Sequence, residues 1–333
     1  MTADGNSSRQ QLAIVIVNYR TADLVVGCIE SLMVQELDAD CHVYIVDNDS
    51  GDGSLEKIRE HVEGAGLEWI SVLAAGKNGG FAYGNNVALR LIQQSVDSDS
   101  ELPDFYWFLN PDTAVRKHSC QVLMDYLNEH KVHIVGSRLE DEDETPQVSH
   151  FNLPSIGNEF VGGISVGVLE RLSPKLRTRR DTIDVPEPCD WVSGSSMMVT
   201  REVIENVGLM DEDYFLYFEE TDYCLKASRA GYTCWHVPDS RVVHYVGGAT
   251  GVSDSRKKSP RRPKYWFDSR RRFFLKNYGV WKLIGADLGY VIGYALFLLR
   301  KKLTGVDLSM EPPHLLSDLI RHSFLMRGFS LDG

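Results

Sequence analysis

Short apolar runs alternate with amphipathic stretches through the first third of the chain. Residues 12–17 are continuously apolar and rich in β-branched side chains, which is typical of a strand buried on both faces. Similar runs at 43–46, 69–73 and 105–109 predict three further strands, and helical periodicity separates the runs at about 22–35, 54–61 and 82–94. Strands that alternate with helices in this way predict an α/β fold with a doubly wound, mostly parallel sheet.

Polar residues stand directly after three of these predicted strands. Residues 18–19 (Asn-Tyr) follow the first strand, residues 47–48 (Asp-Asn) the second, and residues 110–112 (Asn-Pro-Asp) the fourth. Open α/β sheets bind ligands in the crevice at the carboxyl ends of their strands. The sequence therefore predicts one ligand crevice that all three polar segments line.

The periodicity weakens between residues 141 and 187, where proline, glycine and charged residues accumulate. We interpret this stretch as an irregular insertion with a loop over the crevice. Regular patterning returns at residues 190–199, and a helix is expected near Arg201, before an acidic segment around Glu219.

Two carboxylates at the strand ends are candidate ligand contacts. Hard cations such as Mg²⁺ or Mn²⁺ prefer carboxylate oxygens, and such a cation offsets the charge of a leaving diphosphate. Asp112 is placed for that role, although Asn110 and Pro111 before it equally suit a turn that caps the strand. Asp47 suits hydrogen bonding to a nucleobase or ribose, with an Asx-turn as the alternative.

A glycine-rich segment at residues 76–86 opens the helix predicted at 82–94. Its backbone amides and the helix N-terminus are suited to approach a pyrophosphate. The segment matches neither the dinucleotide-binding fingerprint nor the P-loop fingerprint.

The acidic segment contains Glu219, Glu220 and Asp222 and precedes a helical pattern. Negative charge is favourable at a helix N-terminus, so a solvated capping role is one interpretation. The aromatic run at 214–218 would partly desolvate a following carboxylate and raise its proton affinity, which suits a general base. His244 follows two valines and suits either a metal or a polar niche.

Taken together, these segments resemble glycosyltransferase family 2, and in particular its rhamnosyltransferase-like branch. The resemblance rests on seven segments in the family's order and spacing: residues 16–19 (Ile-Val-Asn-Tyr), 46–48 (Val-Asp-Asn), 78–86 (Asn-Gly-Gly-Phe-Ala-Tyr-Gly-Asn-Asn), 109–112 (Leu-Asn-Pro-Asp), 194–198 (Gly-Ser-Ser-Met-Met), 218–222 (Phe-Glu-Glu-Thr-Asp) and 244–248 (His-Tyr-Val-Gly-Gly). It implies a GT-A fold over residues 11–250, after a flexible tail at 1–10, and a metal-dependent, inverting hexosyltransferase-type activity.

The resemblance also implies a role for each candidate residue. Asp112 is the last aspartate of a degenerate Asp-x-Asp motif that holds Mn²⁺ or Mg²⁺ against the donor diphosphate, and His244 is the second metal ligand. Glu220 occupies the position of the catalytic base, with Glu219 beside it. The family more often has aspartate there, so the longer side chain leaves the reach of the base open. The residues expected to bind the donor are Asn18, Tyr19, Asp47, Asn48, Asn78, Gly79, Gly80, Phe81, Asn85, Asn110 and Gly194.

The implied donor is a nucleotide-diphosphate sugar, dTDP- or UDP-linked, with rhamnose as a candidate sugar. The implied acceptor is a hydroxyl of a glycan or lipid-linked sugar in surface-polysaccharide assembly. A sugar-phosphate nucleotidyltransferase would need a glycine-rich basic loop directly after the first strand, where residues 18–21 (Asn-Tyr-Arg-Thr) stand instead. A catalytically idle nucleotide-sugar-binding or scaffold protein remains an alternative.

Composition adds the cellular context. The 333 residues carry a formal net charge of -12, with an acidic run at 140–144 and a basic stretch at 256–276. The six cysteines show no Cys-x-x-Cys pairing, and we expect free, mostly buried thiols in a reducing compartment. Residues 1–10 lack the apolar core of a signal peptide, so we expect a cytoplasmic protein.

The last segment, residues 251–333, is predicted to be a helical extension. Its basic residues are interleaved with aromatic ones, but no other feature supports binding to nucleic acid. Residues 280–299 are apolar apart from Lys282 and Asp287, and this length is at the lower limit for a membrane span. We favour a helix on the anionic inner face of the cytoplasmic membrane; a packed helix, including one that forms a homo-oligomer, and a spanning helix are the alternatives.

Overall fold

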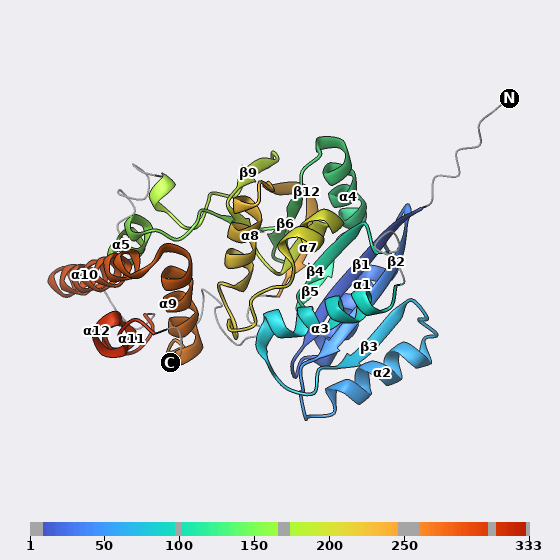
Figure 1. Ribbon diagram of the computed structural model, residues 1–333, viewed down its shortest axis with the longest axis horizontal. Helices are drawn as coiled ribbons and strands as arrows, with labels where there is room; N and C mark the ends of the chain where they lie inside the picture. The colour runs from blue at the N-terminus through green and yellow to red at the C-terminus, as the bar shows by residue number, and fades with distance from the viewer. Residues whose placement is uncertain (1–8, 97–101, 166–173, 246–259, 306–310, 331–333) are drawn as a thin grey trace.

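The computed structural model describes residues 9–96, 102–165, 174–245, 260–305 and 311–330. The residues form an α/β unit at one end and a group of helices at the other (Figure 1). Residues 1–8 of the expected tail, residues 246–248 of the last motif and residues 256–258 of the basic stretch lie outside the described residues.

A mostly parallel sheet forms the centre of the α/β unit, as the sequence predicted. Its strand order is β3-β2-β1-β4-β11-β6-β12-β5. The pairs β1–β2, β1–β4, β2–β3 and β6–β12 are parallel, whereas β11 is antiparallel to β4 and β6, and β5 is antiparallel to β12. The bounds are β1 Gln10–Asn18, β2 Ala39–Asp47, β3 Ile70–Ala74, β4 Phe105–Leu109, β5 Thr113–Val115, β6 Ile134–Glu140, β11 Ser196–Thr200 and β12 Cys234–His244.

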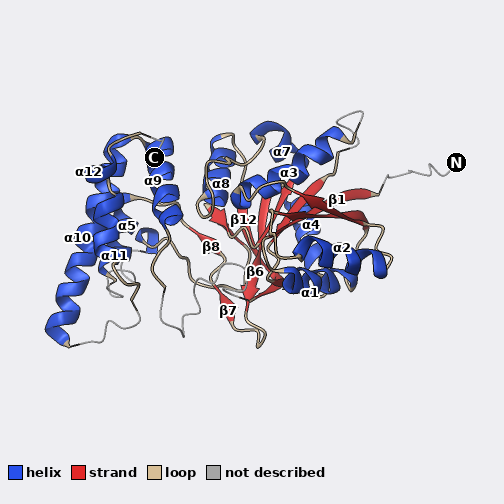
Figure 2. Ribbon diagram, turned by 90° about the horizontal axis from the view of Figure 1, so that it is seen from below, coloured by secondary structure: helices blue, strands red, loops and turns tan. Residues whose placement is uncertain are grey.

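Helices cover both faces of this sheet (Figure 2). Leu12, Ile14 and Ile16 of β1 belong to one core cluster, while Ala13 and Val15 belong to the other. This alternation explains why residues 12–17 are apolar at every position: each face of the strand meets a helical layer. The helices packed on the first face are α1 Ala22–Met33, α2 Ser54–Gly64 and α4 Ser119–His130, and those on the second are α3 Gly80–Gln94, α7 Arg201–Val207 and α8 Glu219–Arg229.

The stretch at residues 141–187 is more regular than the sequence predicted. It contains the short strands β7 Pro146–Gln147 and β8 His150–Phe151, the 3-10 turn η2 Pro174–Leu176 and the start of β9 Glu187–Cys189. It also contains the helix α5 Ile156–Ile164, which begins at a capping box. In that box the Ser155 hydroxyl accepts from the Asn158 amide, and the Asn158 side chain accepts from the Ser155 amide. The expectation of an irregular insertion is therefore wrong for α5.

The C-terminal extension consists of helices, and α5 packs against them. Three glycines on one face of α10, Gly285, Gly289 and Gly293, let the backbones of α5 and α10 approach closely: a Cβ added at Gly293 would lie 2.5 Å from the carbonyl oxygen of Phe160. Helix α10 is also long and apolar enough to cross a membrane by length and composition. The bounds are α9 Lys264–Tyr278, α10 Val280–Thr304, α11 Leu315–His322 and α12 Phe324–Arg327.

Several basic residues of the extension are used inside the fold. Arg270 is buried between two carboxylates, 2.6 Å from Asp287 and 2.8 Å from Glu159. Arg272 pairs with Asp211 at 2.9 Å. Asp287, one of the two charged residues in the apolar stretch at 280–299, forms a buried ion pair with Arg270 that joins α9 to α10.

Candidate active site

The loops after β1 and β2 are joined by a buried hydrogen-bond network. The Asn18 amide donates to Asp47 Oδ1 at 2.7 Å, and the Ser50 hydroxyl donates to the same oxygen at 2.6 Å. The Ser50 backbone amide donates to Asp47 Oδ2 at 3.0 Å, which closes a turn through the aspartate side chain. Both oxygens of Asp47 thus stabilise the loop, and contact of Asp47 with a donor base stays a prediction. Tyr19, in contrast, is 38% exposed beside this network.

The glycine-rich segment begins α3 where another part of the chain passes close by. Gly80 has a φ of +89°, and a Cβ there would lie 1.9 Å from the carbonyl oxygen of Phe215. The Phe81 amide donates to that oxygen at 3.0 Å, and the Gly80 amide donates to Asn78 Oδ1 at 3.1 Å. These two amides are therefore engaged within the chain, and the approach of the segment to a pyrophosphate stays a prediction.

Two asparagines in this region have side-chain oxygens that make no hydrogen bond among the described residues. The Asn48 amide donates to the Gly80 carbonyl at 2.8 Å, and the Asn85 amide donates to the Phe81 carbonyl at 3.0 Å. The Oδ1 atoms of both side chains are buried and unpartnered. Gly79 packs against Tyr83, where an added Cβ would lie 2.4 Å from the ring.

Asp112 and His244 lie close together beside the edge of the sheet where β5 pairs with β12. Pairing of β5 with β12 places Thr113 opposite His244, and His244 Nε2 lies 3.6 Å from Asp112 Oδ1. The other ring nitrogen, Nδ1, lies 3.1 Å from Gln147 Oε1. Burial lowers the pKa of His244, and the nearby charge of Asp112 only partly opposes this effect.

A carboxylate beside a neutral imidazole fits the ligand chemistry of Mn²⁺ or Mg²⁺. No group of three or more histidine, cysteine, aspartate or glutamate side chains that could hold a metal occurs in the described part of the chain. A cation held by Asp112 and His244 would therefore take its remaining ligands from water and from the oxygens of a bound diphosphate.

The loop before β11 lies between this pair and the acidic segment. Ser195 Oγ accepts from the Asn110 amide at 2.9 Å and lies 3.3 Å from His244 Nε2. A Cβ added at the preceding residue, Gly194, would lie 3.2 Å from the Phe81 ring and 3.8 Å from Glu220 Cβ. Two consecutive residues therefore contact the two halves of the candidate site: Gly194 lies against the acidic segment, and Ser195 lies against the Asp112–His244 pair.

The acidic segment is the first turn of α8 and is more enclosed than a solvated cap. Glu219 is only 3% exposed, and burial together with the charge of Glu220 raises its pKa well above the usual value. Burial also raises the pKa of Glu220, although backbone amides at Gly194 and Thr221 favour its charged form. The Oε2 atom of each glutamate is buried and makes no hydrogen bond among the described residues.

Residues of α9 hold this segment in place, which the sequence did not predict. Asp222 is buried and accepts from Lys276 Nζ at 2.7 Å, from the Asn277 amide at 2.6 Å and from the Tyr214 hydroxyl at 3.2 Å. Lys276 also pairs with Asp211 at 2.7 Å. The C-terminal extension thus contributes directly to the position of the acidic turn.

A cavity of about 710 Å³ extends from Glu220 toward α5 and α10. It combines aromatic side chains with four arginines: Phe151, Trp191, Tyr217, Phe218, Trp266 and Tyr290, with Arg177, Arg179, Arg180 and Arg262. Of the two glutamates, only Glu220 lines it. Tyr217 and Phe218 belong to the aromatic run that the sequence placed beside the acidic segment. The other aromatic residues and the arginines share no motif, so the sequence did not predict that they line one cavity.

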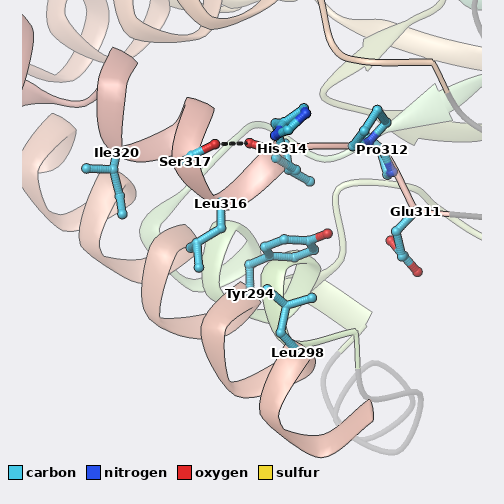
Figure 3. Close-up of a pocket in the computed structure, with 10 residues that line it drawn as sticks. Tyr294, Leu298, Glu311, Pro312, His314, Leu316, Ser317 and Ile320 are labelled. Atoms are coloured by element: carbon cyan, nitrogen blue, oxygen red, sulfur yellow. Dashed lines mark hydrogen bonds between the residues drawn. The ribbon is translucent and has the colours of Figure 1, made fainter. Parts of the chain in front are cut away.

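A second cavity, of about 550 Å³, lies between α10 and α11 (Figure 3). Tyr294 and Leu298 of α10 face Leu316 and Ile320 of α11 across it. It contains none of the residues that the sequence pointed to, so it does not belong to the candidate active site.

Comparison with known proteins shows the family of this chain. The model of the family described as glycosyltransferase-like family 2 matches residues 9–272. The chain belongs to glycosyltransferase family 2. Among curated members, the rhamnosyltransferase WbbL of Escherichia coli K12 is 28% identical over 236 residues, which cover 70% of this chain and 83% of WbbL.

A second relative, the N-acetylglucosaminyl-diphospho-decaprenol L-rhamnosyltransferase of Mycobacterium tuberculosis, is 26% identical over 217 residues. These residues cover 63% of this chain and 68% of the mycobacterial protein. The expected resemblance to rhamnosyltransferases of family 2 is therefore confirmed.

Solved structures show the same GT-A fold. The mannosyltransferase PcManGT from Pyrobaculum calidifontis, in complex with GDP-Man and Mn²⁺, aligns with a TM-score of 0.53 at 14% identity, over 97% of this chain and 88% of that one. GalNAc-T7, with UDP, GalNAc and Mn²⁺, aligns with a TM-score of 0.59 at 13% identity. The alignment covers 98% of this chain and 59% of that one. At these identities the likeness establishes the fold.

Proposed function

We propose that this glycosyltransferase is a metal-dependent, inverting enzyme that transfers a sugar, with rhamnose as the first candidate, from a dTDP- or UDP-linked donor. The acceptor would be a hydroxyl of a glycan or lipid-linked sugar. The observation that carries the proposal is the loop in which Gly194 contacts Glu220 while Ser195 contacts His244. A base and a metal-binding pair that flank one loop suit a reaction between two substrates in one crevice.

In this mechanism Glu220 takes the proton of the acceptor hydroxyl. Its burial favours proton uptake, and the Gly194 amide keeps the carboxylate oriented toward the cavity. The acceptor oxygen then bonds to the anomeric carbon as the bond to the diphosphate breaks on the opposite face, so the configuration inverts. A divalent cation bound at Asp112 and His244 would offset the negative charge on the departing diphosphate.

A donor screen tests the proposal. Wild-type protein is incubated with dTDP- and UDP-sugars and Mn²⁺, and both thermal unfolding and release of free nucleotide are measured. A donor at about 100 times its Kd stabilises the fold by about 2.7 kcal/mol. Nucleotide release that disappears in Glu220→Gln, with the donor still raising Tm, supports catalysis by Glu220. A protein that binds donors but never releases nucleotide, with or without acceptor, would be a nucleotide-sugar-binding protein instead.

We further propose that α10 lies on an anionic membrane surface, with residues 11–250 as the GT-A domain and residues 251–333 as the extension that docks it. The glycine face of α10 is occupied by α5, but a different set of apolar side chains is exposed along its length. They recur three, four or seven positions apart: Trp281, Leu288, Ile292, Leu296, Leu299 and Leu303. Exposed Lys282 and Lys302 stand near its two ends and suit anionic lipid.

Vesicle flotation tests this placement. Wild-type protein should float with vesicles that contain anionic lipid and should float less at high salt. The pair of substitutions Ile292→Glu and Leu296→Glu should abolish flotation, because both side chains would have to bury a charge in the interface. Val34→Glu, at an apolar residue that is 60% exposed outside α10, serves as the control and should float normally. Equal flotation of all three proteins would refute the placement.

A further inference from the structure

The cavity beside Glu220 has the size of a binding site for a small organic ligand. Its volume of about 710 Å³ lies in the range of ligand pockets. Glu220 and Thr221 line one part, whereas Asn158 and Gly162 of α5 and Tyr290 of α10 line another. A molecule that fills it would therefore reach from the proposed base to the helices of the C-terminal extension.

Aromatic rings give the cavity flat apolar surfaces that are held rigidly. Trp191 stacks on Phe151 with ring centres 4.0 Å apart and planes 14° apart. The Trp191 indole nitrogen donates to the Asn152 carbonyl at 3.1 Å, which fixes the ring. Such amphipathic walls suit a ligand that has both apolar faces and hydroxyl groups, as a sugar ring does.

The arginines of the cavity differ in how their charge is balanced. Arg177 pairs with Asp181 through two hydrogen bonds of 2.6 Å, and Arg180 lies 3.2 Å from Glu187. Neither Arg179 nor Arg262 forms an ion pair with a carboxylate of the described residues; Arg179 is exposed to solvent, whereas Arg262 is half-buried.

Arg262 is also held in an unusual setting. Its guanidinium carbon lies 4.3 Å from the centre of the Trp266 ring, and its Nε is buried without a hydrogen-bond partner among the described residues. Glu159 lines the same cavity, but it already pairs with Arg270 at 2.8 Å. Arg262 thus lines the cavity with a positive charge that no carboxylate of the described residues pairs, which suits an anionic group that enters the cavity.

We propose that this cavity is the acceptor site and that Arg262, stacked on Trp266, binds a phosphate oxygen of an acceptor whose sugar is linked through a diphosphate. Guanidinium groups bind phosphate through paired, charge-assisted hydrogen bonds, and this stacking fixes the plane of the fork. The acceptor sugar lies on the aromatic walls with a hydroxyl toward Glu220, and the far side of the diphosphate points toward α10. This inference rests on the proposed function for the chemistry at Glu220, but not for the binding of phosphate.

Binding of geranyl diphosphate tests the inference without requiring the right acceptor sugar. Titrations are done in EDTA, so that a metal-bridged diphosphate at Asp112 and His244 does not contribute, and binding is followed by calorimetry and by the rise in Tm. Wild-type protein should bind the probe, and Arg262→Gln should bind it about 10- to 100-fold more weakly. Arg262→Lys should lie between them, because lysine keeps the charge but lacks the planar fork.

The matched control is Arg321→Gln, which removes the same charge from an exposed position of α11 and should bind like wild type. Equal affinity for geranyl diphosphate and for geraniol would overturn the inference, as would unchanged binding by folded Arg262→Gln. Inorganic pyrophosphate shows whether the diphosphate alone suffices or the prenyl chain adds affinity.

The outcome is separable from the proposed function. If wild-type protein releases nucleotide from a donor but Arg262→Gln binds the probe normally, the inference fails and the enzyme activity stands. If the probe binds in an Arg262-dependent manner but no donor is ever turned over, the proposed function fails and the phosphate site stands.

Discussion

Replacing either buried glutamate by glutamine should stabilise the protein, but only one replacement should abolish catalysis. Glu219 and Glu220 are forced into the first turn of α8 with one carboxylate oxygen each that makes no hydrogen bond among the described residues. A buried polar group left unpaired costs about 1–3 kcal/mol. Glutamine removes the charge but keeps an amide that needs hydrogen-bond partners, so we expect a gain near the lower end, about 1 kcal/mol, or a rise in Tm of about 1–2 °C.

The gain should depend on pH, because burial raises the pKa of both glutamates in the folded protein. Between the usual value of 4.5 and the raised one, the folded state holds more protons than the unfolded state. The stability contributed by these groups therefore falls as pH rises through that window. Glu219→Gln and Glu220→Gln should match wild type in Tm near pH 4 and exceed it at pH 8.

Activity should separate the two variants. Loss of a general base lowers the rate by about 10²- to 10⁴-fold, so Glu220→Gln should lose sugar transfer to that extent. Glu219→Gln should keep most of it, because Glu219 does not line the cavity. A Glu219→Gln variant that loses transfer while Glu220→Gln keeps it would refute the assignment of the base. Lower Tm in both variants at pH 8 would refute the argument from burial.

Three further predictions concern the surroundings of the site. Lys276→Met leaves buried Asp222 short of one partner and should lower the free energy of unfolding by about 1–3 kcal/mol in urea, whereas Lys264→Met, in an exposed pair, should change it by less than about 1 kcal/mol. Gly80→Ala forces a Cβ onto a carbonyl oxygen at φ +89° and should cost about 2 kcal/mol or more, whereas Gly27→Ala, in an open helical position, should be neutral or stabilising. EDTA should abolish sugar transfer and Mn²⁺ should restore it; transfer that is insensitive to EDTA contradicts the role of Asp112 and His244.

The parts of the fold that could be predicted are those whose signal is local. Strand β4 was predicted with its observed bounds because five consecutive apolar residues are buried on both faces. No helix or strand was predicted within residues 113–140, although β5, α4 and β6 lie there. Helix α5 was missed because its nine residues include three glycines, and its stability comes from packing on α10, more than 100 residues later.

The residues of the candidate site also differ in whether a local motif in the sequence predicts them. Asp112, His244 and Glu220 could be proposed as site residues because each stands in a short motif near the end of a strand or the start of a helix. The clamp on Asp222 by Lys276 and Asn277 has no local signature, since its partners are 54 and 55 residues away. Arg262 belongs to the basic stretch at 256–276, and the sequence of that stretch does not predict which of its basic residues form ion pairs with carboxylates.

Adjacent residues, Gly194 and Ser195, contact the two halves of the candidate site, and this arrangement restricts the distance between the halves. Consecutive Cα atoms are about 3.8 Å apart across a planar peptide that resists rotation. In the proposed mechanism, the backbone on this side of the crevice therefore holds the base and the metal-binding pair at a nearly constant spacing. The length of the side chain at position 220 is then what varies, and a glutamate there reaches one methylene farther than an aspartate would.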